Sequence, residues 1–231
     1  MTTLSLLEKK PEQGDASSLI FKTDHPISWK PGQFFHYILP HTPVDDRGTE
    51  RWFTISSSPY DGNIMITTRF VAGRQSSFKK SLHDLALGDT IAADGPEGDF
   101  TLDDLSQDYI FIAGGIGVTP FRAILRQLDH DGAKVKVKLL YANRDDNFVF
   151  KDELTELAQR NSNLQISYFV DPSKIDEAAI RNTAPDLQVP IYYISGPEPM
   201  VDSYKSLLTS MGVAADKIKT DHFPGYLENL S

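Results

Sequence analysis

Cysteine is absent from the 231 residues of this sequence, and its absence excludes several kinds of chemistry. Disulfide bonds, thiolate zinc sites, cysteine nucleophiles and cysteine-ligated iron–sulfur clusters all require a thiol. The six histidines show no metal-like cluster either. We therefore expect no metal ion bound within this chain.

Basic side chains are fewer than acidic ones. The sequence has 23 Lys and Arg against 32 Asp and Glu, which gives a formal net charge of −9. Proteins that bind nucleic acids normally carry a positive excess that displaces counterions from the phosphates, and anionic membrane surfaces attract positive charge in the same way. The charge balance argues against nucleic acid and anionic membrane surfaces as partners.

Long apolar runs are missing as well. No segment approaches the roughly 18 residues of a membrane span, and residues 1–13 lack the basic and apolar regions of a secretory signal. The composition, 40% hydrophobic and 24% charged, is typical of a globular protein, and the length fits one large domain or two small ones. We expect a cytoplasmic protein without a membrane span.

The first half of the sequence consists of short segments rich in β-branched and aromatic residues, separated by turn residues. These segments are 18–23, 33–40, 51–58 and 63–71. Their regular spacing predicts an antiparallel β-barrel or sandwich. One short helix is expected near residues 76–85, where Phe78, Leu82 and Leu85 share a helical face and Ser76 or Ser77 supplies the N-cap.

The pattern changes from about Asp108 onward, where apolar strands alternate with amphipathic helices. The expected strands are 109–114, 135–143, 164–170 and 190–196. This alternation predicts a parallel sheet with helices on both faces, as in Rossmann-like folds. We place a β-barrel domain at 1–104 and an α/β domain at 105–231.

A glycine-rich loop follows the first strand of the second half, in the stretch "IFIAGGIGVTPF" at 110–121. A loop between a strand and the N-terminus of a helix suits an anion such as a dinucleotide pyrophosphate. Glycines in such a turn can also serve packing alone, and the spacing differs from the common G-x-G-x-x-G pattern because Thr119 takes the last position. Both interpretations fit this loop on its own.

A second motif favours nucleotide binding over packing alone as the role of this loop. "RWFTISSSP" at 51–59 lies on a predicted strand of the first half, and together with "GGIGVTP" at 114–120 it resembles the ferredoxin–NADP reductase family of flavoproteins. Further segments agree with that family in the expected order along the whole chain: "KPGQFF", "GRQSSF", "GPEGDF", "YANRDDNFVFKDEL" and "SGPEPM".

The resemblance implies a flavin site in the first domain. Arg51 would bind a flavin phosphate, Phe53 would lie against the isoalloxazine ring in place of the family's usual Tyr, and Thr54 would form a hydrogen bond near flavin N5. The other implied flavin contacts are Trp52, Thr67, Thr68, Arg69, Gly73, Ser76 and Ser77. Either serine could match the family's single one. These phosphate contacts favour FAD over FMN.

The resemblance also implies a site for NADH or NADPH in the second domain. Gly114, Gly115 and Gly117 would approach the nucleotide, with Thr119 beside its nicotinamide end. Ser195 replaces a cysteine that many relatives have near the hydride path. The implied contacts in the same segment are Gly196, Pro197 and Met200.

The choice between the two nucleotides stays open. Asn143 and Arg144 end the strand where the family meets the adenosine ribose, and Arg144 would favour the 2′-phosphate of NADPH. Asp145 and Asp146 follow at once and would repel that phosphate.

The C-terminal segment supplies the last implied contact. Relatives often place an aromatic side chain from this region over the second flavin face, for which Phe223 and Tyr226 are the candidates. Alternatively, both side chains would pack the C-terminal segment against the rest of the protein.

The activity implied is hydride exchange between a nicotinamide and FAD, with Thr54, Thr119 and Ser195 beside the reacting atoms. Electrons would pass to or from a separate carrier such as ferredoxin, or a small molecule, since the chain has no cysteine for an iron–sulfur domain. An acidic ferredoxin would need a basic patch, for which Lys79, Lys80, Arg122 and Arg126 are candidates. The alternatives are a free flavin or quinone reductase, and a non-catalytic flavin-binding subunit.

Overall fold

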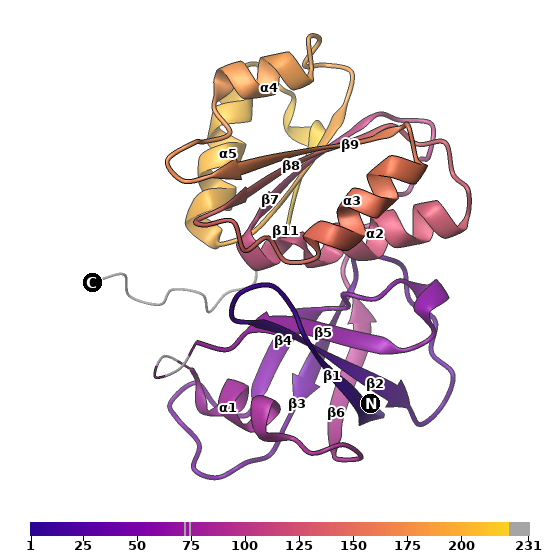
Figure 1. The fold of residues 1–231 in the computed structure, drawn as a ribbon, viewed down its shortest axis with the longest axis vertical. Coiled ribbons are helices and arrows are strands. Elements are labelled where there is room, and N and C mark those ends of the chain that lie inside the picture. The colour runs from indigo at the N-terminus through magenta and orange to yellow at the C-terminus, as the bar shows by residue number, and fades with distance from the viewer. Residues whose placement is uncertain (72, 74, 222–231) are drawn as a thin grey trace.

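The computed structural model describes residues 1–71, 73 and 75–221, which form two domains stacked one above the other (Figure 1). Each domain is built on its own sheet: six strands from the first part of the chain, and five strands from the second part. Within the described residues, no helix is long and apolar enough to span a membrane.

The first domain is an antiparallel half-barrel with the strand order β4-β3-β6-β1-β2-β5. Its strands are β1 (Thr2–Pro11), β2 (Ala16–Thr23), β3 (Phe34–Ile38), β4 (Glu50–Thr54), β5 (Ile64–Arg69) and β6 (Thr90–Glu97). The 3₁₀ turn η1 (Pro59–Asp61) and helix α1 (Ser77–Asp84) complete it. The edge strands β4 and β5 approach each other beyond β4, where the Ser56 N–H donates to the Met65 carbonyl at 2.8 Å. The expected antiparallel β-domain is confirmed.

The core of the half-barrel comes from alternating residues of its strands. Phe21, Phe35 and Ile66 are fully buried and pack with Phe78 and Leu82 of α1. Helix α1 forms where its sequence predicted it, because these two apolar residues fall one turn apart and the Ser76 side chain accepts a hydrogen bond from the Lys79 N–H.

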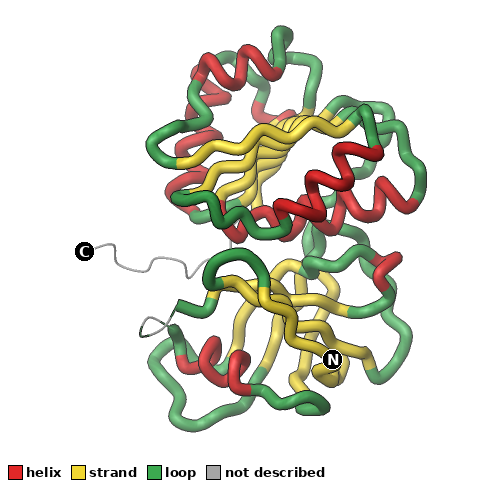
Figure 2. The backbone as a smooth tube through the Cα atoms, in the orientation of Figure 1, coloured by secondary structure: helices red, strands yellow, loops and turns green. Residues whose placement is uncertain are grey.

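The second domain is a parallel sheet with the order β11-β10-β7-β8-β9. Its strands are β7 (Tyr109–Gly114), β8 (Val137–Asn143), β9 (Leu164–Val170), β10 (Ile191–Ser195) and β11 (Ile218–Asp221). Its helical elements are η2 (Gly115–Val118), α2 (Thr119–His130), α3 (Lys151–Arg160), α4 (Glu177–Thr183), α5 (Glu198–Ser210) and η3 (Ala215–Lys217). Figure 2 shows helices on both faces of this sheet, as the sequence predicted.

Burial on both faces explains the continuous apolar strands. Every residue of β7 is buried, because α2 and α3 cover one face of the sheet while α4 and α5 cover the other. The order of the strands reverses at β7, with β8 on one side and β10 on the other. Open α/β sheets bind ligands at the carboxyl ends of the strands at such a reversal.

The two domains share an apolar contact. Ala16, Met65 and Phe100 belong to the first hundred residues, yet they are buried in the core that contains Phe121 and Val118 of the second domain. The two domains therefore share one continuous apolar core at their boundary.

Three strands differ from the sequence-based expectation. β1, β6 and β11 were not expected as strands, and each has a physical reason. β1 loses its alternation at an irregularity between Leu6 and Glu8, β6 contains the poor strand formers of "ADGP", and β11 has only four residues.

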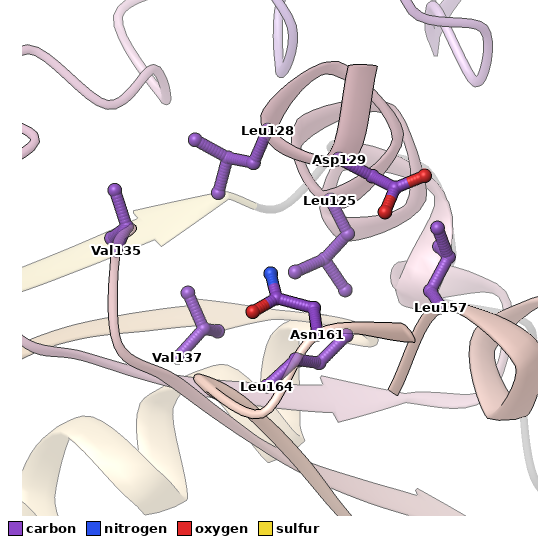
Figure 3. A pocket seen from close by; sticks show the side chains of 8 residues that line it. All are labelled: Leu125, Leu128, Asp129, Val135, Val137, Leu157, Asn161 and Leu164. Atoms are coloured by element: carbon purple, nitrogen blue, oxygen red, sulfur yellow. The ribbon is translucent and has the colours of Figure 1, made fainter. Parts of the chain in front are cut away.

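A small cavity lies between α2, β8, α3 and β9 (Figure 3). Its volume is about 10 Å³, close to the least that holds one water molecule. The lining side chains are Leu125, Leu128, Asp129, Val135, Val137, Leu157, Asn161 and Leu164. None of them is an expected site residue, so this cavity is a packing feature of the helical layer and has no room for a cofactor.

Candidate cofactor-binding site

The end of β4 presents the first group of expected flavin contacts. Phe53 and Thr54 are 7% and 5% exposed, and Phe53 lies within the aromatic core beside Tyr37 and Phe78. Trp52 points to the outer face of the half-barrel instead, where it is 43% exposed and stacks on the ring of His36 at 4.5 Å. Alternation along the strand separates Trp52 from Arg51 and Phe53.

The N-terminus of α1 lies beside Arg51. The guanidinium carbon of Arg51 is 5.4 Å from the centre of the Phe78 ring, in the first turn of α1, and Arg51 also donates to the carbonyls of Arg47 and Glu50. A guanidinium and the positive end of a helix dipole repel each other unless an anion lies near both. The Asp45 carboxylate is one anion at this helix end, and the predicted binding of a flavin phosphate by Arg51 stays a prediction.

Ser76 and Ser77 have different roles at this helix end. Ser76 is the N-cap, whereas the Ser77 N–H donates to a carboxylate oxygen of Asp45 at 2.7 Å and the Ser77 hydroxyl accepts from the Asp45 N–H at 3.0 Å. Burial raises the pKa of Asp45, but its hydrogen bonds to Ser77 and the charge of Arg47 outweigh this and hold the pKa below its usual value. Gly73 lies just before this helix with φ +76° and open space beside its Cα.

The expected contacts on β5 are two buried threonines and one half-buried arginine. The Thr67 hydroxyl shares a 2.8 Å hydrogen bond with Ser18, and the buried hydroxyl of Thr68 has no partner among the described residues. The Arg69 guanidinium pairs with Asp15 and reaches the Asn143 side-chain oxygen at 3.4 Å. The Arg69 side chain thus joins the first domain to the end of β8.

The glycine-rich loop is close to protein atoms at two of its three glycines. A Cβ on Gly114 would lie 2.1 Å from the Met200 sulfur, and one on Gly117 would lie 2.5 Å from the Ser195 carbonyl oxygen and 2.6 Å from Gly196. Gly114 therefore allows the end of β7 to pack against the start of α5, and Gly117 allows η2 to pack against the end of β10. The packing interpretation of the sequence therefore applies to Gly114 and Gly117.

Gly115 differs from its two neighbours. It has φ +53°, and the nearest atom to a Cβ there would be the Asn143 side-chain oxygen at 3.8 Å. Its carbonyl accepts a hydrogen bond of 2.9 Å from the Tyr141 hydroxyl. Gly115 is thus needed for its backbone conformation, while the space beside it stays open. Thr119 begins α2 and is 6% exposed.

Ser195 and Asp221 face each other at the carboxyl ends of β10 and β11. They are paired in the strand register, and the Ser195 hydroxyl donates to the Asp221 carboxylate over a long contact of 3.5 Å. Burial raises the pKa of Asp221 to about 7, the Ser195 hydrogen bond lowers it in part, and the charge of Asp99 raises it further. Asp221 was not predicted from the sequence, because the short segment "IKTD" has a single apolar residue and gives little local signal for a strand.

Asn143 organises the loop that follows β8. Its side-chain nitrogen donates to the Asp145 carbonyl, the Asp145 carboxylate and the Asn147 carbonyl, at 3.0 to 3.1 Å. Arg144, Asp145 and Asp146 are exposed on this loop. Hydrogen bonds to Asn147 hold the pKa of the Asp145 carboxyl below its usual value. The loop therefore presents charges of both signs where the ribose was expected.

The remaining members of the "SGPEPM" segment lie at the start of α5. Pro197 is the N-cap residue of α5, and Met200 lies in the first turn with its sulfur against Gly114. A Cβ on Gly196 would lie 2.5 Å from the Met200 methyl carbon. Phe223 and Tyr226 lie outside the described residues.

The four candidates for a basic patch lie in different domains. Arg122 and Arg126 of α2 pair with Asp61 of the first domain and Glu153 of α3, whereas Lys79 and Lys80 belong to α1 in the half-barrel. The two arginines bind acidic groups because both face the domain boundary. Their charge is therefore not displayed together with that of the lysines.

Comparison with known proteins agrees with this geometry. A family model described as an oxidoreductase NAD-binding domain matches residues 111–206. The ferredoxin reductase component of 3-ketosteroid-9-alpha-monooxygenase from Mycobacterium tuberculosis is 29% identical over 95% of this chain and 64% of its own length.

Solved structures share the fold. The flavohem-like FAD/NAD binding domain of nitric oxide dioxygenase from Vibrio cholerae has a TM-score of 0.82 at 19% identity, covering 95% of this chain and 97% of that one. Ferredoxin-NADP+ reductase from Plasmodium falciparum has a TM-score of 0.79 at 16% identity and covers 95% of both chains.

An antiparallel half-barrel joined to an NAD-binding parallel sheet defines a class of two-domain oxidoreductases. The second domain matches an oxidoreductase NAD-binding domain, and the whole chain is similar to ferredoxin reductase components and shares the fold of ferredoxin–NADP reductase-like flavoproteins, a family that binds FAD and NAD(P)H. It spans about half to two thirds of the length of the curated relatives that it matches, from 53% to 64% for the first of them.

Proposed function

We propose that this chain is an FAD-dependent NAD(P)H oxidoreductase that exchanges hydride between a nicotinamide and the flavin. Electrons would then pass to or from a separate carrier, such as a ferredoxin. The proposal rests mainly on one observation: η2, which contains the glycine-rich loop, packs directly against β5 of the half-barrel. The loop expected to bind nicotinamide therefore borders the strand expected to bind flavin.

The residues of the chain would bind and orient the two cofactors. Arg51 and the N-terminus of α1 fit the flavin phosphates, because both supply positive charge and N–H donors at one place. Thr54 at the end of β4 and Thr68 on β5 are buried hydroxyls suited to the polar edge of a ring system. A bound flavin would supply the redox chemistry, since it accepts two electrons together and can release them singly.

Ser195 and Asp221 are proposed to hold a proton near the nicotinamide end of the site. They lie at the carboxyl ends of β10 and β11, and Ser195 is next to β7, where the strand order reverses and the loop that leads to Thr119 begins. With a pKa of about 7, Asp221 exists in both protonation states near neutral pH, so it can accept a hydrogen bond from the Ser195 hydroxyl or carry a proton itself.

The electron partner is proposed to be another protein. The Mycobacterium tuberculosis relative is named as the ferredoxin reductase component of a monooxygenase, which supports a carrier protein or an oxygenase as the partner. The net charge of −9 would repel an acidic carrier over long range, so we expect docking to be strengthened by added salt.

A parallel reduction assay tests the proposed function. The flavin-loaded protein is mixed with NADH and with NADPH, and ferredoxin, cytochrome c and free flavin are offered in turn as acceptors. We expect one nucleotide to reduce the bound flavin and at least one protein acceptor to be reduced in turn. Binding of flavin without reduction by either nucleotide would instead favour a non-catalytic subunit.

The position of the Asp45 carboxylate favours a second candidate function, that of a free flavin reductase. This carboxylate accepts a hydrogen bond from the Ser77 N–H, at the helix end where we place a flavin phosphate. Competition between these two anions would weaken flavin retention, and a loosely held flavin would act as a substrate. Flavin that is lost on gel filtration, yet reduced catalytically by NAD(P)H when added back, would support this candidate.

A further inference from the structure

A buried arginine at the domain boundary has no part in the cofactor contacts described above. Arg122 lies in the first turns of α2, the helix that runs along the boundary between the domains in Figure 1, and it is 8% exposed. It contacts three separate segments of the chain. Burial of a charged side chain costs solvation free energy, so a buried arginine is normally paired with specific partners.

The contacts of Arg122 cross from one domain to the other. Its Nη1 donates to the Ser56 carbonyl at 2.7 Å and lies 3.6 Å from the Asp61 carboxylate, both in the half-barrel. Its Nε donates to Glu153 of α3 at 2.8 Å. The planar guanidinium thus binds both domains at once, which an ammonium group would do less well.

The positions of these partners relate Arg122 to both halves of the proposed site. Ser56 follows Thr54 by two residues on the segment that leaves β4, and Arg122 follows Thr119 by three residues, which is about one helical turn. One side chain therefore connects the strand end proposed to contact flavin with the helix start proposed to contact nicotinamide.

The backbone beside Arg122 is strained. Phe150 has φ +63°, an uncommon conformation for a bulky residue, and its ring lies 4.9 Å from the Arg122 guanidinium carbon. Phe150 immediately precedes α3, which supplies Glu153. Strain of this kind persists only where the surrounding contacts enforce it.

We propose that Arg122 is a positioning residue that fixes the nucleotide-binding loop against the flavin-binding strand, and so sets the geometry for hydride transfer. This role rests on the proposed function. Arg122 touches neither cofactor in the arrangement described; it acts through the Ser56 carbonyl and through α2.

Arg126 provides a matched control. It lies one turn further along α2 and pairs with the same acids, Asp61 and Glu153, but has no hydrogen bond to the Ser56 carbonyl and no contact with the Phe150 ring in the described structure. Arg126→Met removes one cation from the same cluster, as Arg122→Met does. A difference between the two variants therefore reports on the contacts that only Arg122 makes.

The first measurement compares flavin reduction by NAD(P)H in single turnovers. For Arg122→Met we expect the rate constant at saturating nucleotide to fall about tenfold to a hundredfold, since small displacements of reacting groups have effects of that size. The dissociation constant for nucleotide should change little, and the charge-transfer absorbance of the nucleotide–flavin complex should weaken. Arg126→Met should match the wild type in all three.

The second measurement needs no cofactor. Because the natural chain has no cysteine, Lys22→Cys on β2 and Ser206→Cys on α5, both exposed, would be the only sites for nitroxide labels. We expect Arg122→Met to broaden or shift the distance distribution between the labels, and Arg126→Met to leave it narrow. Arg122→Lys, which keeps the charge, should show the same effects to a smaller extent and serves if Arg122→Met does not fold.

The outcomes separate the two proposals. Rates and distance distributions of an Arg122 variant that equal those of Arg126→Met would overturn the positioning role. Absence of flavin reduction in the wild type would contradict the proposed function, while the label distances would still show whether Arg122 fixes the domains.

Discussion

Asp221 is a residue whose pKa is raised by the fold into the neutral range. Its carboxyl lies at the end of β11 against Ser195, and burial raises its pKa to about 7 from an unfolded value of about 3.9. Between these values the folded protein binds a proton that the unfolded chain releases. The contribution of Asp221 is therefore most favourable below about pH 4 and is lost as the pH rises through about 7.

The first prediction concerns the variant Asp221→Asn. It removes this ionisation, so its free energy of unfolding should exceed that of the wild type at pH 8 and approach it at pH 5. Denaturant titrations at the two pH values measure the difference. Asp216→Asn, at an exposed position of η3, is the control and should show no such trend. An equal pH dependence in wild type and Asp221→Asn would show that Asp221 is not the titrating group.

Arg51 allows a second prediction at the residue scale. Removing a charge-assisted hydrogen bond costs roughly 1.5–3 kcal/mol, which corresponds to about a tenfold to hundredfold loss of affinity. Arg51→Ala should therefore raise the dissociation constant for FAD by that factor, as measured by fluorescence titration of the apoprotein. Arg47→Ala, on the exposed loop before β4, should change it less. Full retention of tightly bound FAD by Arg51→Ala would show that the assigned role is wrong.

Among elements, the turn from β7 into α2 contains glycines with two different tasks. Gly117 is needed because the backbone of Ser195 and Gly196 leaves no room for a side chain. Gly115 is needed only for its φ of +53°, since the space beside it is open. Sequence analysis could recognise the turn, but it could not divide these tasks, because the division depends on the neighbouring strand β10.

The third prediction compares alanine at these two glycines. Gly117→Ala overpacks the contact between η2 and the end of β10 and should lower the free energy of unfolding by about 2–3 kcal/mol. Gly115→Ala should cost only about 1 kcal/mol, the usual penalty for a left-handed alanine. Denaturant unfolding measures both, and equal losses would contradict the division of roles.

How far the sequence predicted each element depended on the strength of its local signal. β7 and β8 were recognisable as apolar runs, and α2 as a segment whose apolar residues repeat at the helical period. β1, β6 and β11 were missed because an irregular register, poor strand formers and short length weaken that signal. Pairing with neighbouring strands, which a local pattern does not contain, stabilises these three.

At the scale of the whole molecule, the domain boundary combines apolar packing with a group of four charged side chains. These are Arg122, Arg126, Asp61 and Glu153. Sequence analysis placed the two arginines on a possible docking patch, because nothing in the local pattern shows that residues 61 and 153 lie opposite them. The pairing of Asp221 with Ser195 could not be predicted either, because the two residues are distant in the sequence.

The fourth prediction concerns acid and the domain boundary. Burial opposes ionisation of Asp61, but its hydrogen bonds and the charges of Arg126 and Arg122 outweigh this and hold its pKa below the usual value. The stabilising effect is therefore present above the unfolded value of about 3.9 and is lost as the pH falls through the lower folded value.

The variant Asp61→Asn should therefore lower the free energy of unfolding by about 1–3 kcal/mol at pH 7. The difference from wild type should shrink below about pH 4. Urea titrations at pH 7 and at acidic pH give the measurement, with the exposed Asp46→Asn as the control. A loss that is the same at both pH values would mean that the charge of Asp61 does not stabilise the boundary.

Flavin and nicotinamide are proposed to react across this domain boundary. The most direct test is anaerobic single-turnover mixing of the FAD-loaded protein with NADH and NADPH, each with hydrogen and with deuterium at the nicotinamide C4 position. We expect at least one nucleotide to bleach the yellow flavin colour, and bleaching to be slower with deuterium. A flavin that stays oxidised with both nucleotides, while nucleotide binding is shown separately, would contradict this proposal.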